Sequence, residues 1–93
     1  MLVIVKSGPD TAEGNRGVGF ARDMAADLIL IQNGVYFALA DKLDGFCGTA
    51  YLLDEDSRLR GIGDEAVGSG LLSVDYDRLV DLIAGADKVV GMM

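Results

Sequence analysis

Cys47 is the one side chain in this sequence with nucleophilic potential. The chain contains a single cysteine and no histidine, which excludes Ser-His and Cys-His nucleophiles, histidine metal sites and histidine proton shuttles. Cys47 lies between Phe46 and Gly48, and neither neighbour is a base. A free cysteine of this kind is commonly a buried, inert hydrophobic residue. We therefore predict no catalytic residue, with a persulfide-carrying Cys47 as the alternative.

The acidic and glycine-rich stretches do not match known metal or phosphate motifs. Asp54-x-Asp56 lacks the third ligand of a calcium loop, because Arg58 occupies that position. The glycines of residues 14–19 reverse the dinucleotide-binding order, and those of residues 63–69 end in serine where a phosphate-binding lysine is required. We therefore expect no metal, no cofactor, and turns at these glycines.

Composition and charge predict a folded, acidic, cytoplasmic protein. The 93 residues are 51% hydrophobic and carry a net charge of −7, and this length predicts a single domain over residues 1–93. The basic residues are scattered, so we expect no direct binding to nucleic acid. No apolar run approaches the roughly 20 residues that span a bilayer. A lone cysteine forms no internal disulfide, and no signal peptide is visible at Met1.

Short apolar runs alternate with helical patterns along the chain. We expect strands over residues 2–5, 28–31, 49–53 and 71–74, and a possible edge strand over 88–90. The helices expected between them cover residues 11–24, a segment after Asn33, residues 54–61, and a last segment that opens at Asp75 or Tyr76. Glycines weaken the first half of the 11–24 segment. This order predicts an α/β fold, a three-layer αβα sandwich around a mostly parallel sheet of about five strands.

The Asn33-Gly34 pair decides between this fold and an all-β one. Asn-Gly between two apolar runs is the strongest short signal for a two-residue hairpin. The apolar residues at 35, 39, 43 and 46 instead keep helical spacing, so we predict a helix capped by Asn33 that ends near Gly45. The turn then lies at the carboxyl edge of a central strand, where open α/β sheets bind ligands. The ligand-edge candidates are Ser7, Gln32, Asn33, Gly34 and Asp54.

The apolar surplus of so short a chain indicates a subunit interface. Val35, Tyr36 and Phe37 follow one another, and we reason that three large apolar residues in succession cannot all face one core. We therefore predict that they dock a sister subunit or a second copy of this chain. A small-ligand-binding module at the turn is the remaining alternative.

Three stretches, in this order, resemble the DsrH/TusB-like proteins of the DsrE-like superfamily. The matching segments are Gln32-Asn33-Gly34-Val35, then Asp54-Glu55-Asp56 with Leu59-Arg60-Gly61, then Val74-Asp75-Tyr76 with Val80-Asp81-Leu82. The resemblance implies a DsrE/DsrH-like fold. It also implies a small non-catalytic subunit of a sulfurtransferase complex, acting in 2-thiolation of the tRNA wobble uridine or in related intracellular sulfur oxidation.

The resemblance also implies partners. The sulfur-carrying cysteine belongs to a DsrE/TusD-type sister subunit, and a DsrF/TusC-type subunit completes the complex. This sequence departs from the family pattern in having Leu79 where phenylalanine is usual. A stand-alone homo-oligomer that uses Cys47 as its persulfide carrier is therefore kept as the alternative.

Overall fold

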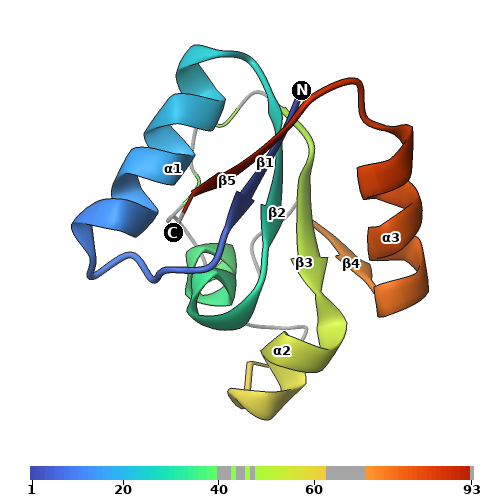
Figure 1. Cartoon of the computed structure of the whole chain (residues 1–93). Coiled ribbons are helices and arrows are strands. Elements are labelled where there is room, and N and C mark those ends of the chain that lie inside the picture. The colour runs from blue at the N-terminus through green and yellow to red at the C-terminus, as the bar shows by residue number, and fades with distance from the viewer. Residues whose placement is uncertain (40–42, 44–45, 47, 63–70, 93) are drawn as a thin grey trace.

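A five-stranded parallel sheet forms the centre of the fold (Figure 1). The structure, a computed structural model, describes residues 1–39, 43, 46, 48–62 and 71–92. Its strands are β1 (Leu2–Val5), β2 (Asp27–Leu30), β3 (Ala50–Leu53), β4 (Leu71–Val74) and β5 (Val89–Met92). They lie in the order β4-β3-β2-β1-β5, and every neighbouring pair is parallel. The predicted α/β fold with a parallel sheet of five strands is confirmed.

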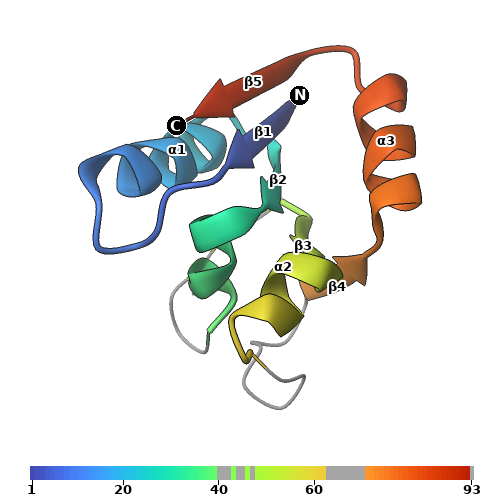
Figure 2. The same ribbon diagram turned by 60° about the horizontal axis from the view of Figure 1, so that its bottom comes forward.

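The helices lie on both sides of this sheet and beyond its carboxyl edge. They are α1 (Ala12–Asp23), the 3-10 helix η1 (Gln32–Ala38), α2 (Asp54–Leu59) and α3 (Tyr76–Gly85). Figures 1 and 2 show α1 and α3 on opposite sides of the sheet, while η1 and α2 follow the carboxyl ends of β2 and β3. The three predicted layers are therefore present. Within the described residues, no helix is long and apolar enough to cross a bilayer.

Side-chain alternation along the strands divides the core in two. Val3, Leu28 and Leu52 belong to the larger cluster, which also contains the buried residues of α1 and η1. Leu2 and Ile29 belong to the smaller cluster, which is closed by α3. Residues of β2 are fully buried on both faces, which explains why this strand reads as a continuous apolar run.

Helix α1 is regular from its first turn, so the expectation of a weakened first half is wrong. The Thr11 hydroxyl caps the helix by accepting a hydrogen bond from the Gly14 amide at 3.0 Å. A Cβ atom at Gly14 would clash with the carbonyl oxygens of Ser7 and Gly8. Glycine therefore lets α1 begin directly against the loop that leaves β1, and this close packing offsets its low helix propensity.

The turn after β2 leads into a helix and not into a hairpin, as predicted, but the helix differs from the prediction. It is a 3-10 helix that begins at Gln32, one residue before the predicted Asn33 cap, and no side chain caps it. The backbone returns to an extended conformation at Leu39. Asn33 is not the N-cap because Gln32 already adopts the left-handed conformation that turns the chain. The predicted end near Gly45 lies outside the described residues.

The other predicted helix ends agree with the structure. Asp75 caps α3, where its carboxylate accepts a hydrogen bond from the Arg78 amide at 2.8 Å. Gly61 follows α2 with a φ of +71°, the left-handed conformation in which glycine commonly ends a helix. Asp75 lies at the predicted start of the last helix, and Gly61 is the last residue of the predicted 54–61 segment.

Candidate functional site

The loop after β1 and the turn after β2 meet at the carboxyl edge of the sheet. The Ile31 amide donates a hydrogen bond to the Val5 carbonyl at 3.1 Å, and the Gly34 amide donates to the Ile31 carbonyl at 2.8 Å. A Cβ atom built on Gly34 would clash with the Val5 carbonyl oxygen. Glycine at position 34 therefore lets η1 begin directly against the end of β1.

An open pocket of about 570 Å³ lies at this edge. Of the described residues, Pro9, Asp10, Asn33 and Tyr36 line it. Asp10 and Asn33 offer hydrogen-bonding groups, and Tyr36 offers an aromatic ring and a hydroxyl. These groups can hold and orient a small polar molecule or a peptide segment, but none of the four is a thiol or an imidazole. Where the structure describes the chain, no three acidic or thiol groups converge as metal ligands.

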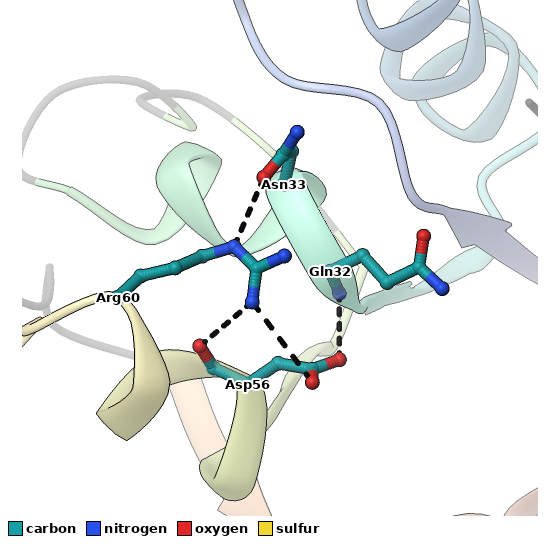
Figure 3. A network of polar contacts seen from close by, with 4 residues as sticks. All are labelled: Gln32, Asn33, Asp56 and Arg60. Atoms are coloured by element: carbon teal, nitrogen blue, oxygen red, sulfur yellow. Dashed lines mark hydrogen bonds and ion pairs between the residues drawn. The ribbon is translucent and has the colours of Figure 1, made fainter.

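A polar network ties the turn after β2 to α2 (Figure 3). The Asp56 carboxylate accepts a hydrogen bond from the backbone amide of Gln32 at 2.7 Å. The two residues are 24 positions apart in the sequence. Arg60 Nε donates to the side-chain oxygen of Asn33 at 3.0 Å, and Arg60 Nη1 donates to the Asp56 carbonyl at 3.2 Å. Arg60 Nη1 also lies 4.0 Å from Asp56 Oδ1. The network therefore holds the turn at two points: Asp56 binds the Gln32 backbone, and Arg60 binds the Asn33 side chain.

Gln32 is held in a strained conformation at the centre of this network. Its φ is +49°, a left-handed conformation that costs a non-glycine residue roughly 1–2 kcal/mol. The strain is tolerated because the Asp56 carboxylate accepts a hydrogen bond from the backbone amide of Gln32 in this left-handed conformation. The Gln32 side chain points away from Asp56 and Arg60 in Figure 3, and the residue is exposed.

Replacing Gln32 with glycine should therefore stabilise the protein. Glycine adopts a positive φ without a Cβ penalty but loses more conformational entropy on folding, so we expect a net gain of about 0.5–1 kcal/mol. Urea denaturation measures the change. Gln32→Ala is the matched control: it removes the same polar group but keeps the Cβ, and it should not stabilise. Equal stability of the two variants would contradict a strained Gln32.

A comparison with protein families assigns the chain. The family model described as "DsrH like protein" matches residues 20–89, which is more than half of the chain. The chain belongs to the DsrH-like family. The match includes all three of the stretches that carry the resemblance noted in the sequence. Among curated proteins, none matches this DsrH-like chain significantly.

Solved structures with the same fold extend over nearly all of this DsrH-like chain. The solution NMR structure of Tm0979 from Thermotoga maritima is 28% identical, covers 94% of both chains and has a TM-score of 0.70. A second NMR structure of TM0979, described as a candidate sulfur transferase, is 26% identical, covers 96% of this chain and 97% of the other, and has a TM-score of 0.62. The crystal structure of ychN from E. coli shares the fold at 15% identity, with coverage of 98% and 97% and a TM-score of 0.76.

The structure brings only some of the ligand-edge candidates together in this DsrH-like chain. Gln32 and Asn33 belong to the network, and Gly34 packs against the end of β1. Ser7 is half-buried in the loop after β1. Asp54 instead begins α2 and pairs with Arg58 within that helix, at 2.8 Å. Cys47 lies outside the described residues.

Sequence reasoning missed four residues of this edge. Asp56 and Arg60 complete the network, and Pro9 and Asp10 line the pocket. Asp56 in the first turn of α2 and Arg60 at its C-cap stand four positions apart, so they lie on the same side of this helix. That spacing was available in the sequence as a signal. No sequence signal identified the turn after β2 as their partner, because that turn comes from a distant part of the chain.

The predicted interface of Val35, Tyr36 and Phe37 rests on a premise that is wrong. Val35 and Phe37 are both buried in the larger cluster, and only Tyr36 is half-buried. The reason is that η1 contacts α2, β2 and β3, so that it is enclosed on more than one side. Two side chains that point in different directions from η1 can therefore both reach the core. Tyr36 lines the pocket at this edge.

Proposed function

We propose that this chain is a small non-catalytic subunit of a sulfur-relay complex. The observation that carries the proposal is the DsrH-like family match over residues 20–89. The description of a Thermotoga protein of the same fold as a candidate sulfur transferase supports it. The relay would pass persulfide sulfur toward 2-thiolation of the tRNA wobble uridine, or serve the related intracellular oxidation of sulfur. The proposal includes a cytoplasmic location and a single domain over residues 1–93.

The side chains at the carboxyl edge of the sheet support a non-catalytic role in the relay. Asp10, Asn33 and Tyr36 offer hydrogen bonds and an aromatic surface, and the chain as a whole has one cysteine and no histidine. A persulfide relay needs a thiol at each carrier, since each transfer is attack of a thiolate on the outer sulfur of the previous persulfide. The four residues that line the pocket supply no thiol. The DsrH-like family match supports placing the carrier cysteine on a DsrE/TusD-type sister subunit, with a DsrF/TusC-type subunit as a further partner.

Reconstituted sulfur transfer tests this proposal. The sister subunits from the same organism are charged with radioactive persulfide and mixed with tRNA, ATP and the enzyme that activates and thiolates the wobble uridine. The amount of 2-thiouridine is then measured with and without this chain. We expect omission of the chain to lower product by about tenfold or more, within the range of typical coupling between sites. We expect Cys47→Ser to leave transfer unchanged.

Two outcomes would count against this assignment. Full transfer without the chain would contradict a role as a required subunit. Loss of transfer with Cys47→Ser, while the complex still assembles, would favour the alternative in which Cys47 carries persulfide. If the organism's tRNA keeps its 2-thiouridine after deletion of the gene but sulfur oxidation fails, the chain serves sulfur oxidation and not tRNA thiolation.

A further inference from the structure

Helix α3 covers its side of the sheet incompletely. Of the described helices, α3 alone closes the smaller cluster, through buried Leu79 and half-buried Leu82. On the same side of the sheet, Ile4, Ile31 and Tyr51 are only partly buried. The opposite side differs: α1 and η1 both contribute to the larger cluster there. One side of the sheet is therefore left with apolar surface that a single ten-residue helix does not cover.

A second exposed apolar surface lies on α3 itself. Tyr76, Val80 and Ile83 stand at positions i, i+4 and i+7, so they share one face of the helix. They are 54%, 61% and 36% exposed. At 100° per residue, this face lies about a quarter turn from the one that Leu79 and Leu82 direct at the sheet. We call these three residues the α3 stripe.

Two strand residues add to the surface on this side of the sheet. Leu72 pairs in register with Tyr51, and Val89 pairs with Leu2. Tyr51 and Leu2 both belong to the cluster under α3, and residues paired in a parallel sheet point to the same face. Leu72 and Val89 are nevertheless 52% and 39% exposed. Because β4 and β5 are the two edge strands, these residues lie at opposite edges of this side of the sheet. The contiguous exposed apolar surface is the α3 stripe, and contiguous apolar surface of this kind marks interaction sites.

Charges around the stripe indicate what kind of partner fits it. Asp77 and Asp81 each follow a stripe residue, and both are exposed; Asp75 precedes the helix and is also exposed. Asp87 forms an ion pair with the N-terminal ammonium at 3.3 Å. The exposed bases here are Arg78 and Lys88, so the acids remain in excess. A symmetric contact that placed the α3 stripes of two copies face to face would bring Asp77 and Asp81 of both copies close together, in a chain whose net charge is already −7. Like charges placed against each other in an interface cost several kcal/mol. A different protein with lysine or arginine around an apolar centre is the complementary partner.

We propose that the α3 stripe docks a non-identical protein subunit whose contact surface has an apolar centre and a basic rim. This inference rests on the proposed function, because the proposed function supplies the partner, and it adds where that partner binds. It also moves the expected interface from Val35 and Phe37, which are buried, to the opposite side of the sheet.

The test measures binding of this chain to the purified, sulfur-carrying sister subunit. The apolar variant is the double substitution Val80→Ala and Tyr76→Ala, and we expect it to weaken binding by about tenfold or more, as for central anchors of an interface. Asp77→Lys with Asp81→Lys should weaken binding further, and affinity should fall as salt is added. The matched controls are Leu59→Ala and Asp23→Lys, which change an exposed apolar residue and an exposed acid outside α3. They should leave binding unchanged.

Failure of this inference is distinguishable from failure of the proposed function. If the wild-type chain does not bind the sister subunit at all, the proposed function is contradicted, and the stripe as its docking site with it. If the complex forms but the α3 variants bind as tightly as the controls, only the location is wrong. If the chain self-associates, and neutralising Asp77 and Asp81 strengthens that association, the occupant is a second copy and the proposal is overturned.

Discussion

Replacing Gly34 with alanine is expected to destabilise the protein by about 1–3 kcal/mol, the usual range for forcing an added carbon into a packed site. The added Cβ would meet the carbonyl oxygen of Val5, the last residue of β1. Backbone atoms of a central strand cannot swing aside as the end of a flexible side chain can. Either η1 or the end of β1 must shift, and both belong to the candidate site. Urea denaturation followed by circular dichroism measures the loss.

A second glycine provides the control for this substitution. Gly19 lies inside α1, and a Cβ atom there would meet nothing within 4 Å. Gly19→Ala should therefore stabilise the protein, by up to about 1 kcal/mol, because alanine has the higher helix propensity. The two glycine-to-alanine changes are thus expected to have opposite signs. Similar effects of both would show that the close approach of Gly34 to β1 is not what requires glycine.

Replacing Asp56 with alanine is expected to cost about 1.5–3 kcal/mol, the range for a hydrogen bond that involves a charged group. The variant removes the acceptor of the Gln32 amide and leaves the strained φ of Gln32 without support. The largely buried Arg60 side chain also loses its nearby carboxylate. Thermal denaturation measures the stability, and hydrogen exchange of the Gln32 amide reports on the turn itself.

The neighbouring acid Asp54 is the matched control for Asp56. Both stand in the first turn of α2, but Asp54 pairs with exposed Arg58 on the same helix. Exposed pairs four positions apart on a helix contribute about 0.3–0.5 kcal/mol, so Asp54→Ala should have a small effect. Asp56→Asn keeps a neutral acceptor and should fall between the two. If Asp54→Ala and Asp56→Ala are equally destabilising, the network is not what fixes the turn.

The features predicted correctly from sequence are those that depend on short local patterns of residues. The apolar run of β2, the start of the last helix at Asp75 or Tyr76 and the glycine that closes the 54–61 segment each depend on a few adjacent residues, and the structure has all three. The alternation of such signals was enough to give a parallel sheet. The family motifs also lie in these segments.

What could not be predicted depends on contacts between distant segments. The conformation of Gln32 is fixed by Asp56, and Asn33 accepts a hydrogen bond from Arg60 instead of capping a helix. Val35 and Phe37 are both buried because η1 packs among three other elements. Gly14 was judged by its helix propensity, whereas its close approach to the loop after β1 decides its role. In each case the deciding partner comes from another part of the chain.

The position of β1 in the sheet has a consequence for how the chain folds. β1 pairs with β2 on one side and with β5, the last strand, on the other, with Leu2 opposite Val89. On the ribosome, β1 can pair with β2 early, but its second edge stays open until β5 has been made. Contacts between such distant segments slow folding, and segments with few buried contacts open first in the native state. We therefore expect α3 and β5 to join last and to exchange their amide hydrogens before the β1–β3 sheet does.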